Sequence, residues 1–329
     1  MHGQTDRRVF CCWGVKMKKV IVTGANGFIG TALLWEMSKQ NIKIYAVIKD
    51  KFENIDHIKD IPGVEIVYCS QENIFDLPKL INERDIEVLI HLAWAGSFGD
   101  LRADYNLQLL NVKNALDTVC AMEVMGIKRF VGVGTLAEKD VLNYHLEDGA
   151  NPSIVSIYGI AKLSMQLMTK AQCNKMGIEH VWCYLSNTYG IGNTTNNFVN
   201  MVARKILGGE EAAFSEATQL YDFVYVTDTV NAIYSVAERG EKNKSYYLGS
   251  GDARPLREYI YLIRDAIDPS YPLHLGKLPF HGKSLGEDAY SIEKLKTDTG
   301  FSPKVSFEEG IKKTIAWLKK EGGEGVTKI

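Results

Sequence analysis

The chain has 329 residues, 46% of them apolar and 24% charged, with a formal net charge of −2. Such totals are those of a soluble globular protein with one large or two ordinary domains. The near-neutral charge excludes nucleic acid and anionic membrane surfaces as partners on electrostatic grounds, and no apolar run reaches the ~18 residues of a transmembrane helix. The six cysteines, at positions 11, 12, 69, 120, 173 and 183, show no repeated spacing. They are therefore expected to be buried thiols in a reducing, cytoplasmic setting rather than disulfides or metal ligands.

Residues 1–16 precede the first recognisable element of the chain. Their apolar run, Phe10-Cys11-Cys12-Trp13, is too short for the core of a signal peptide. Met17-Lys18-Lys19 looks like a natural beginning. We therefore expect the first sixteen residues to be a disordered or expression-derived extension.

A glycine-rich turn follows the β-branched apolar run Val20-Ile21-Val22. Three glycines stand at positions 24, 27 and 30, and residues 31–37 have the composition of a helix. Glycine allows positive φ and leaves no Cβ between a helix N-terminus and a pyrophosphate, which the unpaired N–H groups and the helix dipole can hold. Strand, turn and helix in this order predict the start of a dinucleotide-binding βαβ unit. The predicted cofactor contacts here are Gly24, Asn26, Gly27, Phe28, Ile29 and Gly30.

β-rich apolar runs alternate with helical stretches through the first half of the chain. Such alternation predicts an α/β Rossmann fold, a doubly wound parallel sheet with helices on both faces and ligands at the carboxyl ends of its strands. After the first strand, the expected strands cover 42–48, 64–69, 88–93, 130–133 and 180–185, and the expected helices cover 77–83, 105–125 and 157–176.

The end of the second expected strand bears on the choice of cofactor. Asp or Glu at this place binds the ribose 2′-hydroxyl in many NAD-binding folds, but here Ile48 is followed by Lys49 and Asp50. A lysine can pair with a 2′-phosphate, which a carboxylate would repel. We therefore expect NADP, with Lys49 as a cofactor contact. The alternative is NAD, with a solvated Lys49 and with Asp50 on the ribose.

The fourth expected strand ends in His91-Leu92-Ala93-Trp94, where small residues let a cofactor lie close. We expect Leu92, Ala93 and Trp94 to contact the cofactor. His91 is expected to be a hydrogen-bonded structural histidine, because no metal-ligating partners stand near it. Asn111, early in a long helix, could reach back to the cofactor beside the nicotinamide, or it could be an amide on the helix surface.

Tyr158 and Lys162 lie four residues apart at the start of a helix and therefore on one face of it. Lys162 can hold the cofactor ribose while its charge lowers the pKa of the Tyr158 phenol. A tyrosine shifted toward neutrality can donate or accept a proton at a carbinol or carbonyl oxygen. Thr135, just past the fifth strand, can bind the substrate oxygen or serve as a cap or turn residue. The predicted catalytic residues are Thr135, Tyr158 and Lys162.

These residues give the chain a family resemblance. It resembles the extended short-chain dehydrogenase/reductases, the nucleotide-sugar epimerase/dehydratase/reductase superfamily, over about residues 17–320. The resemblance implies that Tyr158 is the acid/base, that Lys162 orients the nicotinamide ribose and that Thr135 positions the sugar hydroxyl. It also implies that Asn187 holds a nucleotide sugar and that the long helices pair in a homodimer. The matching segments lie at 23–30, 91–93, 111–112, 135, 158 with 162, 186–190, 221–228, 299–303 and 308–311.

The second half is expected to interleave with the first. Residues 17–185 and about 222–245 are expected to form the Rossmann domain, with a strand at 223–226 that returns to the main sheet. Residues from about 186 to 221 and from 246 to 329 are expected to form a smaller α+β substrate domain, to which the resemblance assigns a strand at 246–249. Further helices are expected over 198–207, 229–238, 255–267 and 311–319.

Departures from the family pattern narrow the choice of reaction. Dehydratases of this family carry an Asp-Glu pair directly after the hydroxyl residue, where this chain has Leu136-Ala137. Glu138 comes one residue later and is expected to point elsewhere. Tyr221 stands where many members have an arginine on the nucleotide diphosphate, and a tyrosine can hydrogen-bond a phosphate but brings no charge. The predicted substrate contacts are Thr135, Asn187 and Tyr221.

The sequence therefore predicts an NAD(P)-dependent oxidoreductase that acts on a nucleotide-activated sugar, with a 4-keto-6-deoxyhexose reductase as the leading hypothesis. The first alternative is a nucleotide-sugar 4-epimerase that retains NAD and uses the same three catalytic residues. The second is a non-enzymatic NADP-binding regulatory protein, although such proteins typically lose the tyrosine or the lysine. No residue pattern selects among dTDP, CDP, UDP and GDP sugars.

Overall fold

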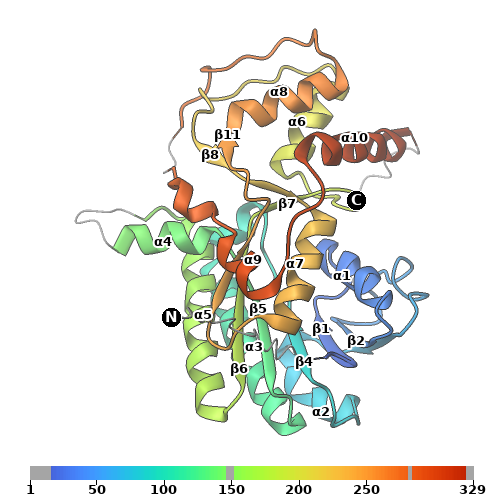
Figure 1. The fold of residues 1–329 in the computed structure, drawn as a ribbon. Coiled ribbons are helices and arrows are strands. Elements are labelled where there is room, and N and C mark those ends of the chain that lie inside the picture. Colours follow the sequence, from blue (N-terminus) through green and yellow to red (C-terminus); the bar gives the residue numbers. More distant parts are fainter. Residues whose placement is uncertain (1–15, 146–151, 281–283, 324–329) are drawn as a thin grey trace, which may run out of the picture.

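The computed structural model of the protein describes residues 16–145, 152–280 and 284–323, so all of the expected extension except Lys16 lies outside the described residues. A seven-stranded parallel sheet forms the centre of the fold, in the strand order β10-β6-β5-β4-β1-β2-β3 (Figure 1). This order confirms the predicted doubly wound fold, with its topological switch point between β1 and β4. The strands are β1 (Lys19–Thr23), β2 (Lys43–Ile48), β3 (Val64–Tyr68), β4 (Val88–His91), β5 (Arg129–Thr135), β6 (Glu179–Leu185) and β10 (Ser245–Leu248).

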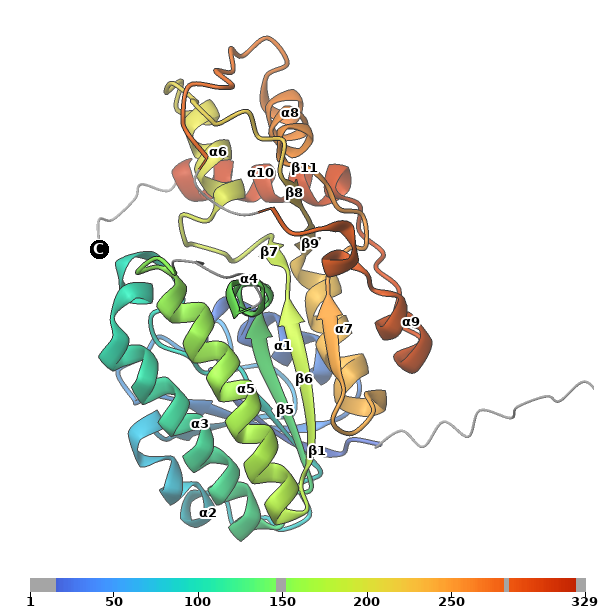
Figure 2. The same ribbon diagram turned by 90° about the vertical axis from the view of Figure 1, so that its left-hand side faces the viewer.

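Helices cover both faces of the sheet (Figure 2). On one face α1 (Phe28–Ser38) packs against α7 (Val226–Arg239), and on the other α3 (Tyr105–Met125) packs against α5 (Ser156–Met176). Side chains of a strand alternate between the two faces. Thus Val20 and Val22 are buried with α1 and α7, whereas Ile21 is buried with α3 and α5.

The remaining elements of this part are short. They are α2 (Leu77–Leu80), α4 (Ala137–His145), α9 (Glu293–Thr299) and the 3-10 helices η1 (Gln71–Asp76), η2 (Gly99–Ala103) and η3 (Glu287–Tyr290). In the part of the chain that the structure describes, no helix is long and apolar enough to cross a membrane.

Local signals explain where the helices begin and end. The prediction of a helix over 105–125 is confirmed, because the Asp104 carboxylate caps the first turn and Gly126, at φ +75°, ends the last one. The helix predicted over 77–83 stops at Leu80, because the backbone of Ile81 is extended.

The glycine turn packs tightly against the end of β4. Gly24 has φ +68°, and a Cβ added to it would lie 2.8 Å from the backbone nitrogen of Ala93. A Cβ on Gly30 would collide with the carbonyl oxygen of Gly24. These two positions therefore require glycine for backbone conformation and close approach, as the motif predicts.

The predicted places of two strands are wrong. β9 (Phe223–Tyr225) pairs with β7 (Asn187–Tyr189) in a separate two-stranded sheet and does not return to the main sheet. The edge beside β6 is taken by β10, the segment assigned above to the smaller domain. A parallel neighbour needs a crossover helix, and α7 directly precedes β10, whereas β9 lies before α7. The rest of the predicted domain division stays a prediction.

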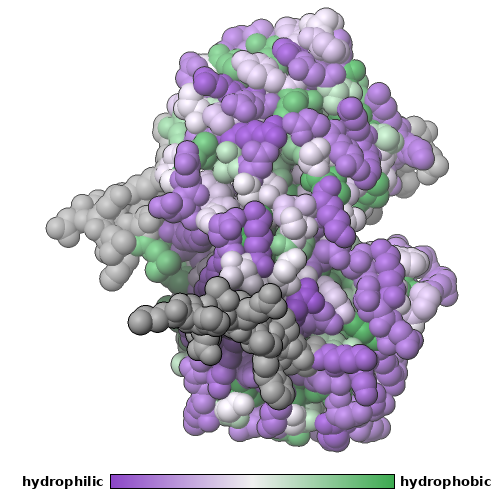
Figure 3. Space-filling model, viewed as in Figure 1, coloured by the Kyte–Doolittle hydropathy of each residue, from purple (hydrophilic) through white to green (hydrophobic). Residues whose placement is uncertain are grey.

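A smaller α+β part lies above the carboxyl ends of the sheet (Figure 1). Its core is aromatic: the ring of Phe223 lies 4.8 Å from that of Tyr259 and 5.7 Å from that of Phe307. On the face shown in Figure 3, most residues of both parts are hydrophilic. The elements of the smaller part are α6 (Phe198–Leu207), α8 (Leu256–Ile267), α10 (Phe307–Gly323), β7, β9, β8 (Leu220–Tyr221) and β11 (Arg254–Pro255).

Candidate active site

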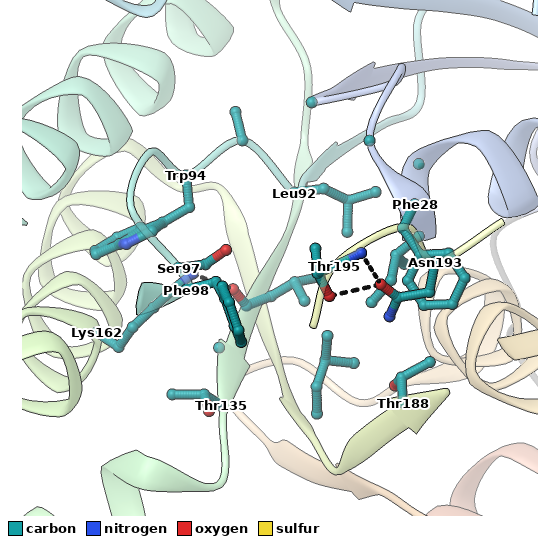
Figure 4. A pocket seen from close by; sticks show the side chains of 18 of the residues that line it. Phe28, Leu92, Trp94, Ser97, Phe98, Thr135, Lys162, Thr188, Asn193 and Thr195 are labelled. Carbon is teal, nitrogen blue, oxygen red and sulfur yellow. Dashed lines mark hydrogen bonds between the residues drawn. The ribbon is translucent and has the colours of Figure 1, made fainter. Parts of the chain in front are cut away.

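A cavity of about 520 Å³ opens at the carboxyl ends of β1, β4, β5 and β6, beside the switch point of the sheet (Figure 4). Open α/β sheets bind their ligands at this place. The predicted residues that line the cavity are Gly24, Asn26, Gly27, Phe28, Ile29, Gly30, Leu92, Ala93, Trp94, Thr135, Tyr158 and Lys162.

One end of the cavity suits a diphosphate. α1 begins at Phe28, directly after Gly27, and no side chain caps its first turn. The first N–H groups of a helix lack partners within the helix. Because Phe28, Ile29 and Gly30 line the cavity, these donors and the positive end of the helix dipole face it. The residues present therefore fit a dinucleotide cofactor.

Lys162 lies at the other end of the cavity beneath Trp94 (Figure 4). Its ammonium donates to the carbonyl oxygen of Val133 at 3.0 Å and lies 3.9 Å from the centre of the Trp94 ring. Burial lowers the pKa of Lys162, and the charge of Glu138 opposes that shift. The side chain is thus a buried cation held between a strand carbonyl and an aromatic face.

Tyr158 stands one helical turn before Lys162, as predicted, and is buried. Burial raises its pKa to about 12, while the charge of Arg102 and the Thr135 side chain act in the opposite direction. The expectation that Lys162 lowers the pKa of this phenol is therefore wrong in this structure. Loss of solvent is the dominant effect on Tyr158, and the nearest compensating charge is Arg102, 4.5 Å above its ring.

Thr135 ends β5 and lines both the first cavity and a second one described below. Its hydroxyl accepts a hydrogen bond from the Ala137 N–H at 3.4 Å, so it also caps the turn into α4. That bond is long and uses only one acceptor site. The hydroxyl can therefore also bind a substrate oxygen, and the two interpretations of Thr135 are compatible.

A second cavity of about 290 Å³ adjoins the first, and Thr135 and Tyr158 line both. Asn187 and Tyr221, the other predicted substrate contacts, line this cavity as well. The guanidinium of Arg102 and the carboxylate of Asp140 add charged groups. Burial raises the pKa of Asp140, and the charge of Arg102 opposes that shift.

Comparison with known proteins identifies the family of the chain. Residues 20–249 match the model of the NAD dependent epimerase/dehydratase family. The chain belongs to this family. It is 22% identical to dTDP-glucose 4,6-dehydratase of Escherichia coli, over 91% of this chain and 92% of the relative. It is also 22% identical to an Escherichia coli dTDP-4-dehydro-6-deoxyglucose reductase, over 91% of this chain and 97% of the relative.

The fold of the family is confirmed by solved structures. UDP-N-acetylglucosamine 4-epimerase from Methanobrevibacter ruminantium M1, in complex with UDP-N-acetylmuramic acid, has a TM-score of 0.76 at 20% identity. The similarity covers 93% of this chain and 100% of that chain. Membership of the epimerase/dehydratase family makes the chain an enzyme of an NAD-dependent nucleotide-sugar class, and the non-enzymatic alternative is not supported.

Two of the residues predicted to contact the cofactor, Lys49 and Asn111, do not line the first cavity. Lys49 is exposed and lines another cavity, of about 710 Å³, with Asp50 and Lys51. Asn111 reaches back from α3, as expected, but its amide binds the backbone of Ala95 at both ends, at 2.8 and 3.0 Å. These bonds let Asn111 shape the loop after β4, and its contact with the cofactor stays a prediction.

Sequence reasoning missed residues from segments far apart in the chain. Ser97, Phe98 and Arg102 come from the loop and 3-10 helix after β4, and no local motif marks them. Asn193 and Thr195 line the first cavity from the polar stretch after β7, where Asn193 accepts two hydrogen bonds from Thr195 (Figure 4). The only signal in the sequence for Asn193 and Thr195 is that they belong to a polar stretch directly after two glycines.

His91 and three of the cysteines are buried inside the fold. His91 Nδ1 lies 3.0 Å from the hydroxyl of Thr23, which confirms the structural role predicted for it. Cys69, Cys173 and Cys183 are buried free thiols, as expected, whereas Cys120 is a free thiol that is only half-buried. Within residues 16–145, 152–280 and 284–323, no three His, Cys, Asp or Glu side chains are grouped to hold a metal ion.

Proposed function

We propose that the protein is an NAD(P)-dependent oxidoreductase that reduces a nucleotide-activated 4-keto-6-deoxyhexose at C4. One observation supports this most directly. Thr135, Tyr158 and Lys162 share a cavity, while Leu136 and Ala137 line the adjoining cavity where a dehydratase of the family carries its Asp-Glu pair. The site thus keeps the groups for hydride chemistry and lacks the acid pair for loss of water.

Thr135, Tyr158 and Lys162 would each have a separate role in the reduction. The cofactor, when bound, supplies the hydride for C4 of the sugar. Burial holds the pKa of Tyr158 at about 12, so its phenol is protonated at neutral pH and ready to donate to the C4 oxygen. The Thr135 hydroxyl would hold that oxygen, and the Lys162 ammonium would hold the nicotinamide ribose.

The second cavity is proposed to hold the sugar and its diphosphate. Arg102 offers donors in a planar fork, and Asp140 offers acceptors. Such a pair can bind several hydroxyl groups of one sugar ring. The Arg102 side chain lines this cavity, and its buried Nε has no hydrogen-bond partner among the described residues. Asn187 and Tyr221 would add neutral hydrogen bonds from the smaller part.

A 4-epimerase is the second candidate, and the high structural similarity to a UDP-N-acetylglucosamine 4-epimerase favours it. The same three residues would oxidise C4 and reduce it again from the other face. An epimerase keeps its cofactor through the cycle, whereas a reductase exchanges it. Cofactor retention therefore separates the two.

The choice of NADP rests on Lys49 and Lys51, which line the cavity after β2 and β3 together with Asp50. The family description names NAD and gives NADP no support. If Lys49 pairs with a 2′-phosphate, Lys49→Ala should weaken NADP binding roughly fivefold while NAD binding stays unchanged, because a pair of this kind contributes about 1 kcal/mol. Titration calorimetry with both cofactors measures this, and equal losses would leave Lys49 without that role.

A homodimer is proposed from exposed apolar residues on α3 and α5. Leu109 and Val124 on α3, and Leu167 and Met168 on α5, are between 49% and 69% exposed. These two helices pack side by side (Figure 2). A four-helix contact between two copies would cover this surface.

The function is tested by assay of the purified protein. A reductase should oxidise NADH or NADPH, followed at 340 nm, in one-to-one proportion with a dTDP-, CDP-, UDP- or GDP-4-keto-6-deoxyhexose. An epimerase should convert UDP-glucose to UDP-galactose without net change at 340 nm and should carry NAD through purification. The absence of both activities across the panel would contradict the proposed function.

A further inference from the structure

Glu138 is buried directly behind the proposed catalytic threonine. It lies in the first turn of α4 with no exposed surface and does not line either cavity of the site. A Cβ added to Gly134 would collide with its Oε1. The carboxylate therefore occupies the space left by a glycine at the end of β5.

The hydrogen bonds of Glu138 fit an ionised carboxylate. The Thr135 N–H donates to Oε1 at 2.7 Å, and the Trp182 indole N–H donates to Oε2 at 3.1 Å. Both nitrogens can only donate hydrogen bonds, and each carboxylate oxygen accepts one of them. A protonated Glu138 would instead need an acceptor for its own proton. Burial raises the pKa of Glu138, and these two donors and the charge of Lys162 oppose the shift.

A buried negative charge needs a buried partner. Lys162 is 5% exposed, and its ammonium is bound to Val133, two residues before Thr135 on the same strand. In the described part of the chain, Glu138 is the acidic group that acts on Lys162. The two buried groups are held at backbone positions two residues apart at the end of β5, and each charge acts on the pKa of the other.

We propose that Glu138 is a positioning residue for the reaction: it is the buried counter-charge that keeps Lys162 an ammonium, and it fixes the backbone of Thr135. This inference rests on the proposed function, because it concerns the residues assigned there to the cofactor ribose and the sugar oxygen. It deepens that function by explaining how a lysine nearly removed from water stays charged.

The other titratable groups around the pair do not replace Glu138. Burial and the charge of Lys162 lower the pKa of His91, from β4, to about 3, so His91 is neutral. Tyr158, from α5, is neutral because its pKa is about 12. Arg102, from the loop after β4, is a cation over the Tyr158 ring. None of them brings a negative charge.

Two substitutions separate charge from shape. Glu138→Gln keeps the shape and removes the charge, and Glu138→Asp keeps the charge and shortens the side chain. For each variant, kcat/KM and the affinity for NAD⁺ are measured from pH 6 to pH 10. Glu138→Gln should move the alkaline loss of both quantities to lower pH by about one unit, because an opposite charge nearby shifts a pKa by 1–3 units. Glu138→Asp should keep the wild-type midpoint at a lower rate.

A structural role alone predicts losses that are the same at every pH in both variants, because the Gln amide places an N–H against one of the two donors and the Asp side chain is too short. That result, or an unshifted midpoint for Glu138→Gln, would overturn the proposal. The NAD⁺ affinities apply even if the protein turns over no sugar, so failure of the proposed function is distinguishable from failure of this inference.

A double-mutant cycle provides the second measurement if Glu138→Gln folds poorly. The free energies of unfolding of Glu138→Gln, Lys162→Met and the double variant are compared by urea denaturation. A buried pair predicts that the double variant loses less than the sum of the two single losses, since neither charge is left unpaired. Additive losses would contradict the pairing.

Discussion

At the scale of single residues, burial decides the protonation of the site more than neighbouring charges do. Tyr158 has a raised pKa although Arg102 lies over its ring, and Lys162 has a lowered one although Glu138 is its partner. Removal from water disfavours a charged form whatever its sign. The neutral phenol of Tyr158 and the ammonium of Lys162 therefore share the cavity, and the proposed counter-charge of the ammonium is the buried carboxylate of Glu138.

The first prediction concerns the phenol of Tyr158. Tyr158→Phe should lower kcat by about 10²–10⁴-fold, the usual contribution of general acid catalysis, and leave cofactor affinity nearly intact. Tyr246→Phe is the matched control, because its hydroxyl donates to Asp298 at 2.8 Å and lines neither cavity. The measurements are kcat and NAD⁺ affinity. Unchanged turnover in the first variant would remove Tyr158 from the mechanism.

The second prediction concerns pH and two buried histidines. His91 and His180 are each 1% exposed and have pKa values lowered by burial from 6.5 to about 3. The unfolded chain therefore takes up protons first, and stability falls as the pH drops below 6.5, by about 1.4 kcal/mol per unit for each histidine. His180→Gln should reduce the slope of this fall by about 1.4 kcal/mol per pH unit, the contribution of one histidine. Urea unfolding between pH 7 and pH 4.5 measures it, and parallel curves would refute the assignment.

At the scale of elements, one buried carboxylate ties the smaller part to the main sheet. Asp222, between β8 and β9, accepts from the Tyr247 hydroxyl of β10 at 2.8 Å and from the Ser250 N–H at 3.0 Å. Its own carbonyl accepts from the Ser186 hydroxyl at the end of β6. The loops that follow two sheet strands are thus fixed by a residue that belongs to neither.

The third prediction follows from this arrangement. Asp222→Ala should lower the free energy of unfolding by roughly 3 kcal/mol, because buried donors lose a charged acceptor. Asp252→Ala is the control: its side chain is 59% exposed in an ion pair with Arg254, and its loss should cost less than about 1 kcal/mol. Chemical denaturation of both variants tests the difference. Similar losses would show that Asp222 does not fix these loops.

At the scale of the whole molecule, the proposed homodimer would join two copies of the chain through α3 and α5. Exposed Leu109 on α3 and Leu167 on α5 lie on helices that cover one face of the sheet, away from the smaller part (Figure 2). Large apolar side chains left exposed on two adjacent helices suit an interface.

The fourth prediction tests the dimer. The wild-type protein should have twice the chain mass in light scattering, and Leu109→Glu with Leu167→Glu should reduce it to the monomer, since two charges cannot be buried there without partners. Trp35→Glu, at a 48% exposed residue of α1 on the opposite face, should leave the mass unchanged. A monomeric wild type would disprove the dimer.

The sequence by itself determined the strand, glycine turn and helix at residues 19–38, the long helices α3 and α5, and the Tyr158–Lys162 pair. Each depends on neighbours a few residues away, through strand alternation, caps and helical spacing, so local patterns are sufficient. Only the tertiary structure decided that β10 rather than β9 completes the sheet, that Asn111 binds Ala95, and that Arg102 and Glu138 surround the site. Those outcomes depend on which distant segments exclude water together, and such contacts leave no periodic signal in the chain.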